Sequence, residues 1–243
     1  MTCCATGLLT LWPWVFFNEF ILASRYPIVD EEIAIVERSL VEESLQRMQP
    51  EIRRQYPLDY AYPEDTIVAI GSSQTWGSGA ALREDAWTYQ LETILNEANS
   101  PREHLVVNAG IPGAESHELF RFYEDFMSQY PHKLLVIALG CNDRDANLFY
   151  EYLERFVVLA RSSGVTPLLV VEALSHENAP EGTKQGWVLQ AVAEAYDVPL
   201  FDLHNAVAPY QDAGFFWWDI VHPTSFGHAC IAKALAPFIQ EHL

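Results

Sequence analysis

Residues 67–80 read Ile-Val-Ala-Ile-Gly-Ser-Ser-Gln-Thr-Trp-Gly-Ser-Gly-Ala, an apolar run that passes into small residues. A short β-branched and aliphatic run bounded by glycine is typical of a buried strand, and Gly71 and Gly77 would give the backbone freedom to turn after it. Ser73 would lie in that turn, at the carboxyl end of a strand, where open α/β sheets bind their ligands. Ser73 is therefore a candidate nucleophile. A serine between glycines is also ordinary turn chemistry, so this assignment depends on partners elsewhere in the chain.

The rest of the chain alternates short apolar runs with helical patterns. Strands are expected at residues 66–71, 104–108, 133–139, 166–171 and 198–203. Helices are expected at residues 83–96, 116–130, 146–163, 183–196 and 225–243. This alternation predicts a three-layer α/β/α, flavodoxin-like sandwich with a five-stranded parallel sheet. Right-handed crossovers would then bring every strand-to-helix loop to one edge of that sheet.

The amino-terminal part of the chain, residues 1–29, is ambiguous. Its apolar stretch, Leu8 to Leu22, lacks a basic flank, contains Pro13 and Glu19, and is shorter than the roughly 20 residues that span a bilayer. Three interpretations stay open: a segment packed on the domain or lying at an interface, a truncated or degenerate membrane anchor, and a signal peptide. Accordingly, both a cytoplasmic location and a membrane-associated, extracytoplasmic location stay open.

Residues 30–64 are predicted to lead into the main domain, residues 65–243. Asp30 can cap an amphipathic helix over residues 30–49, whose apolar side chains recur at helical spacing. The proline- and tyrosine-rich piece that follows, residues 50–64, is expected to break the helix.

The composition excludes several classes of protein. With 243 residues, half of them hydrophobic, the chain suits one α/β domain with a sizeable core. A formal net charge of -19 argues against binding to nucleic acid or to an anionic membrane surface. The four cysteines lack metal-ligand spacing, so no metal site is predicted. Cys141 and Cys230 are expected to be small buried residues, and lipidation of Cys3 and Cys4 stays open.

Three further loops would meet Ser73 at the same edge of the sheet. Gly113 follows the second strand in a glycine- and proline-containing turn, so its backbone N–H can stabilise a developing oxyanion. Asn142 follows the third strand and can direct its side-chain amide donors into the same crevice. Asp219 lies three residues before His222, so its carboxylate can orient the imidazole and leave Nε2 free as a base. Taken alone, each has a structural alternative as a turn or a helix cap.

Together these motifs resemble the SGNH hydrolase superfamily, also called GDSL-type lipases and esterases. The resemblance covers about residues 66–243, and its most specific parts are Gly-Cys-Asn-Asp at 140–143 and Asp-Ile-Val-His-Pro at 219–223. The first block of the family usually reads Gly-Asp-Ser, whereas this chain has Ser72 before Ser73. A carboxylate at that position would be expected to brace the turn, so the strength of the bracing is in question. Ser72 as the nucleophile is the alternative to Ser73.

The resemblance implies a serine esterase. By motif position Ser73 is the nucleophile, His222 the general base and acid, and Asp219 its orienting carboxylate. The backbone N–H groups of Ser73 and Gly113 and the side chain of Asn142 would form the oxyanion hole. The implied substrates are carboxylic esters of carbohydrates or lipids, and no cofactor is implied. A sugar O-acyltransferase and a non-catalytic carbohydrate-binding module are the alternatives, and the oligomeric state is not predicted.

Several other residues are candidates for supporting roles. Aromatic residues near the predicted crevice are candidates for substrate binding or for plain packing: Trp76, Trp217 and Trp218, with Phe215 and Phe216 beside them. Trp87 is also a candidate for a wall of the crevice, but it lies one helical turn from Leu91 and is expected in the core. His228, inside the last predicted helix, is expected to be structural. The long connection over residues 172–186 is expected to be either a solvated loop or a substrate lid.

Overall fold

The structure, a computed structural model, describes residues 27–97, 103–174, 184–211 and 215–243. The predictions for residues 8–22, for Cys3 and Cys4, and for most of residues 172–186 lie outside the described residues. The chain divides into two compact units, Met1–Glu43 and Ser44–Leu243. Within the described part, no helix combines the length and the apolar character that crossing a membrane requires.

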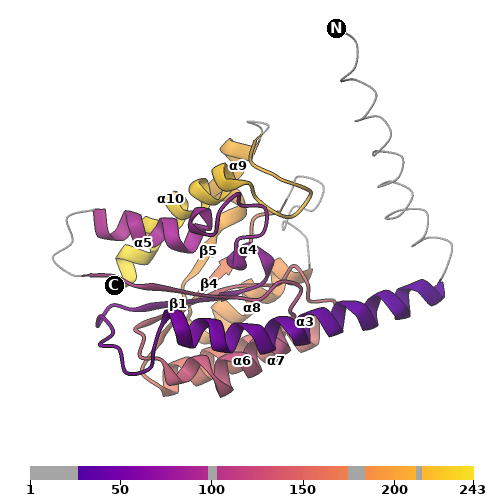
Figure 1. The fold of residues 1–243 in the computed structure, drawn as a ribbon, viewed down its shortest axis with the longest axis horizontal. Helices are drawn as coiled ribbons and strands as arrows, with labels where there is room; N and C mark the ends of the chain where they lie inside the picture. Colours follow the sequence, from indigo (N-terminus) through magenta and orange to yellow (C-terminus); the bar gives the residue numbers. More distant parts are fainter. Residues whose placement is uncertain (1–26, 98–102, 175–183, 212–214) are drawn as a thin grey trace, which may run out of the picture. The chain divides into compact units, whose positions relative to one another are not determined.

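A parallel sheet of five strands forms the centre of the second unit (Figure 1). The strands are β1 (Ile67–Gly71), β2 (Val106–Gly110), β3 (Leu134–Ala138), β4 (Thr166–Val171) and β5 (Leu200–Asp202). Their order is β2-β1-β3-β4-β5, and every neighbouring pair is parallel. This is the strand order of flavodoxin-like sheets, in which the ligand crevice opens between β1 and β3, where the chain switches direction across the sheet.

Helices cover both faces of this sheet, which confirms the predicted three-layer α/β/α fold (Figure 1). One layer contains α5 (Trp87–Glu97), α9 (Leu203–Gln211) and α10 (Ser225–His242). The other contains α6 (Ser116–Asp125), α7 (Ala146–Ser162) and α8 (Lys184–Tyr196). The remaining elements are α3 (Pro27–Gln55), α4 (Ser73–Trp76) and two 3₁₀ turns, η2 (Arg83–Asp85) and η3 (Met127–Gln129).

The main core lies between the sheet and the layer of α5, α9 and α10. Alternate side chains of the strands point into it, among them Ile67 and Ala69 of β1, because successive side chains of a strand face opposite sides. Trp87 and Leu91 of α5 pack there with 2% and 0% of their surface exposed, as predicted. Burying such a side chain contributes about 1.5–3 kcal/mol.

Strand β2 begins two residues later than predicted. The prediction began at His104, but the backbone of His104 is engaged by the side chain of Asn96, which donates to its carbonyl at 3.0 Å and accepts from its N–H at 2.9 Å. A residue whose backbone groups are held in this way cannot join the ladder, so pairing starts at Val106. The later register places Asn108 inside the strand.

The prediction that Pro50 breaks the first helix is wrong. Helix α3 begins at Pro27, where a proline suits the first helical position, and continues through Pro50 to Gln55. A proline in a helix interior costs about 3 kcal/mol because it removes a hydrogen bond and crowds the preceding turn. Met48 and Ile52 on either side are 2% and 1% exposed, so the burial of their side chains offsets that cost.

Candidate active site

The candidate nucleophile Ser73 begins α4, directly after β1. Helix α4 packs so closely on the sheet that a Cβ on Gly71 would lie 2.1 Å from Thr75 Oγ1 and 2.2 Å from the Ala138 carbonyl oxygen. Gly71 is therefore needed for close approach, and not for the backbone freedom that we predicted. Gly77 does end α4 in the left-handed region, with φ of 105°. The sharp turn from strand to helix presents Ser73 at the carboxyl edge of the sheet.

The structure brings His222 and Asp219 to Ser73. His222 Nε2 lies 3.0 Å from Ser73 Oγ, and His222 Nδ1 lies 2.7 Å from Asp219 Oδ2. Asp219 Oδ1 also accepts the backbone N–H groups of Val221 and His222 at 2.8 and 2.7 Å. Partial burial alone would raise the pKa of Asp219, but these hydrogen bonds outweigh it and hold the pKa below its usual value. An ionised Asp219 accepts the Nδ1–H of His222 and so leaves Nε2 able to take a proton from Ser73.

The predicted oxyanion donors line the same cavity as the serine. This cavity of about 370 Å³ has Ser73, Gly113, Asn142 and His222 in its wall. Gly113 has φ of 77°, which favours glycine at the turn. Asn142 Nδ2 donates to the Ala114 carbonyl at 3.0 Å, and its second amide hydrogen can donate to an oxyanion in the cavity.

Comparison with known proteins gives the family. A model of the GDSL-like lipase/acylhydrolase family matches residues 69–230, more than half of the chain, and this range includes the three residues described above, Ser73, Asp219 and His222. The chain belongs to this family. The resemblance of its motifs to this family is thereby confirmed. No functionally curated protein matches the sequence closely.

Solved structures share the fold of this chain. A two-domain esterase active on acetylated mannans is 22% identical with a TM-score of 0.63, and the match covers 73% of this chain and 49% of that one. The chain thus spans about half the length of that esterase. The lipase/acylhydrolase from Enterococcus faecalis is 22% identical with a TM-score of 0.62, covering 74% and 97% of the two chains. An acetyl xylan esterase is 16% identical with a TM-score of 0.61, covering 71% and 98%.

Two polar residues that the sequence analysis missed hold α4 in place. Asn108 of β2 donates its amide to the Thr75 carbonyl at 2.7 Å. Gln74 is buried and donates to the carbonyls of Ala173 and Val221 at 2.7 and 2.9 Å. The signal for Asn108 was an amide inside an apolar run, because a buried polar side chain requires partners. Gln74 gave no such signal, because its partners come from distant loops.

One prediction for the loop after β3 is wrong. We expected Cys141 to be buried, but it is exposed and lines the cavity, because it follows the strand and lies in the loop that forms the wall. Cys230 in α10 is 6% exposed, as expected.

Asp143 is buried and accepts the backbone N–H of Ser116 at 3.0 Å, so it fixes the start of α6. Burial raises the pKa of Asp143 to about 6, although hydrogen bonds from Ser116 oppose the shift.

The two adjacent serines have different partners. The hydroxyl of Ser73 faces His222, whereas Ser72 Oγ donates to Glu172 Oε1 at 3.1 Å. Of the two serines, only Ser73 has the imidazole of His222 within hydrogen-bond reach, which favours it over Ser72 as the nucleophile. Among the described residues, no group of three or more His, Cys, Asp or Glu side chains is placed to hold a metal ion.

The predicted aromatic residues surround the site without lining its cavity. Trp76 lies in α4 with the guanidinium of Arg83 5.6 Å from its ring. Trp217 packs edge-to-face on Phe216 at 4.8 Å. Trp218 is 73% exposed, and its backbone N–H donates to the His222 carbonyl at 2.8 Å. None of these tryptophans is among the described residues of the cavity wall, and their role in substrate binding stays a prediction.

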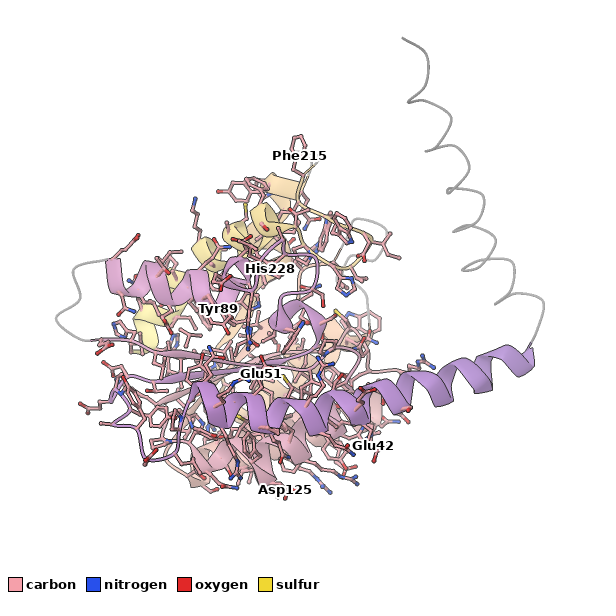
Figure 2. The ribbon with its side chains drawn as sticks, in the orientation of Figure 1. Glu42, Glu51, Tyr89, Asp125, Phe215 and His228 are labelled. Atoms are coloured by element: carbon pink, nitrogen blue, oxygen red, sulfur yellow. The ribbon has the colours of Figure 1, made fainter. Side chains whose placement is uncertain are left out.

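Phe215 and Phe216 separate into two environments. Phe216 is fully buried in the core, so plain packing describes it. Phe215 is 74% exposed, and its ring points outward (Figure 2). Of this aromatic run, Phe215 and Trp218 therefore present the largest exposed rings near the loop that contains His222.

Proposed function

We propose that this protein is a carboxylic ester hydrolase that cleaves its ester through a covalent acyl-enzyme on Ser73. The observation that carries this proposal is the continuous hydrogen-bonded line from Asp219 through His222 to Ser73, with distances of 2.7 and 3.0 Å. His222 Nε2 takes the hydroxyl proton while Ser73 Oγ bonds to the ester carbonyl carbon, and the carbonyl π electrons move to its oxygen. When that oxyanion reforms the carbonyl, the bond to the alcohol oxygen breaks and His222 returns the proton to the departing alcohol.

Water completes the cycle by the same steps. His222 deprotonates a water molecule, which adds to the acyl carbon, and collapse of this second intermediate releases the carboxylic acid and restores Ser73. In both steps the negative oxygen would be stabilised by the N–H groups of Ser73 and Gly113 and by the amide of Asn142. Asp219 would remain ionised and hold the imidazolium that forms.

The substrate that we propose is a short-chain ester, with acetylated carbohydrate first. The cavity beside Ser73, at about 370 Å³, is near the lower end of the range for small-molecule sites and suits a small acyl group. The exposed rings of Phe215 and Trp218 next to the His222 loop offer flat faces for a sugar. Esterases of similar fold that act on acetylated mannans and acetyl xylan support the same choice.

The test of the mechanism is a pair of serine variants assayed on a short-chain chromogenic ester. Ser73→Ala should lose about 10⁴-fold or more in turnover, because triad members act as a unit. Ser78→Ala is the matched control, since Ser78 lines the same cavity and, among the described residues, its hydroxyl makes no hydrogen bond to His222. A serine-directed phosphonate should label Ser73 in the wild-type protein. An active Ser73→Ala variant, or a folded protein without an adduct on Ser73, would refute the mechanism.

The test of the substrate is a series of esters from acetyl to dodecanoyl, together with acetylated xylan and mannan. We expect kcat/KM to be highest for acetyl and to fall as the acyl chain lengthens. A maximum at long chains would refute the short-chain proposal and favour lipids. Transfer of the acetyl group to an added sugar in place of water would favour the acyltransferase alternative.

A further inference from the structure

A buried carboxylate lies beside the nucleophile turn on a different strand from it. Glu172 follows β4 directly and is only 5% exposed. Its Oε1 accepts from Ser72 Oγ at 3.1 Å, and its Oε2 accepts from the backbone N–H of Cys141 at 3.2 Å. A carboxylate is rarely buried unless it has a definite set of partners, and the partners here are two loops of the candidate active site.

The position of this carboxylate can be compared with the first sequence block of the family. A Gly-Asp-Ser block has a carboxylate in the turn itself, whereas this chain has Ser72 there. We propose that Glu172 supplies the missing carboxylate from β4 and is a positioning residue for Ser73. This inference rests on the proposed role of Ser73 as the nucleophile.

The sheet order makes the substitution geometrically possible. Only β3 separates β1 from β4, and neighbouring strands lie about 4.8 Å apart, so their ends are about 10 Å apart. A long side chain from β4 and a short one after β1 can meet above the end of β3, and Glu172 and Ser72 do so. The same carboxylate reaches the loop after β3 through Cys141, next to the predicted oxyanion donor Asn142.

Two consecutive residues after β4 accept hydrogen bonds from the residues on both sides of the nucleophile. Ser72 donates to Glu172, and Gln74 donates to the carbonyl of the next residue, Ala173, at 2.7 Å. The amide of Gln74 also reaches the Val221 carbonyl, beside the predicted base. Glu172 and Ala173 therefore link the nucleophile turn with the loops of the oxyanion donor and the base.

The chemistry of this arrangement predicts how it responds to substitution. Burial raises the pKa of Glu172, although hydrogen bonds from Cys141 and Ser72 oppose the shift. A second carboxylate at position 72 would face Glu172 in a poorly solvated place, where two like charges repel. If Glu172 is replaced by glutamine, the amide can donate to a carboxylate at position 72 while its oxygen still accepts from Cys141.

The experiment is a double-mutant cycle with Ser72→Asp, Glu172→Gln and the double variant, all in the full chain. We measure the rate at which the phosphonate labels Ser73, the pH dependence of that rate, and the urea midpoint. Ser72→Asp alone should slow labelling at least about 10-fold at pH 8, with a larger loss as pH rises, because both carboxylates then ionise. The double variant, which combines Ser72→Asp with Glu172→Gln, should label Ser73 at a rate within about 3-fold of wild type.

Glu92→Gln is the matched control, because Glu92 is half-buried, accepts the Val106 N–H at 2.8 Å and has no contact with the site. It should leave the labelling rate unchanged. Losses that multiply in the double variant, or a fully active Ser72→Asp variant, would overturn the role of Glu172. If wild-type Ser73 is not labelled at all, the proposed function fails, and the urea midpoints still decide whether Glu172 and Ser72 are coupled.

Discussion

Replacing Asn142 with alanine removes the side-chain amide from the loop after β3. One amide hydrogen donates to the Ala114 carbonyl at 3.0 Å, and the other is available to an oxyanion in the cavity shared with Ser73. The first bond is present in the free protein, so its loss should cost about 1 kcal/mol of folding stability. The second would form only as charge develops on the substrate, so its loss should raise the barrier by about 2.7–4 kcal/mol.

These magnitudes separate two measurable effects. We expect kcat on a short-chain ester to fall by about 10²- to 10³-fold, with KM nearly unchanged, because the second bond is made in the transition state and not in the ground state. Thermal unfolding should show only a small loss of stability. Asn147→Ala is the matched control, because Asn147 is an exposed asparagine in the first turn of α7 and should keep full activity.

Three outcomes would contradict the reasoning about Asn142. Turnover within about 3-fold of wild type would show that its amide does not stabilise the oxyanion. A loss confined to KM would assign Asn142 to ground-state binding. A large loss of stability that accounts for the lost activity would reduce its role to holding the Ala114 loop.

Two further predictions concern stability. Burial lowers the pKa of His228 to about 4, although a hydrogen bond to the Ser78 carbonyl opposes the shift, and Figure 2 labels this residue in α10. The unfolded chain binds a proton at this histidine below about pH 6.5, whereas the folded chain binds it only near pH 4, so stability is lost as pH falls through this window. In urea unfolding, the free energy of unfolding of the wild type should fall by about 2 kcal/mol more between pH 7 and 5 than that of His228→Gln. Equal losses in the two proteins would contradict this. In Gly71→Ala the new Cβ would meet the Ala138 carbonyl at 2.2 Å, so we expect about 1–3 kcal/mol of destabilisation in thermal unfolding and reduced kcat/KM; an unchanged Tm would show that α4 has room to move.

Local patterns in the sequence were sufficient for the sheet and for part of the site. The predicted strand at 166–171 matches β4, because an apolar run between turns has few other ways to bury itself. The pairing of Asp219 with His222 could also be expected, since a spacing of three residues places them within reach on one turn. Membership of a known family gave Ser73 and His222 their expected roles before any contact between them was visible.

The predictions were wrong where the place of a residue in the tertiary structure outweighed its local preference. Pro50 was expected to end a helix, but the burial of Met48 and Ile52 keeps α3 intact. Cys141 was expected to be buried by its residue type, yet its position after β3 exposes it in the cavity wall.

The sequence by itself determined the succession of strands and helices along the chain, the local pair of Asp219 and His222, and the identity of the family. Tertiary structure alone decided that Ser73 Oγ lies 3.0 Å from His222, 149 residues away, and that Glu172 lies against Ser72. The reason is physical: hydrophobic periodicity and turn chemistry act over a few residues, whereas these contacts exist because parallel strands bring the ends of β1, β3 and β4 to one edge. A side chain such as Glu172 acquires its partners only when that edge has formed.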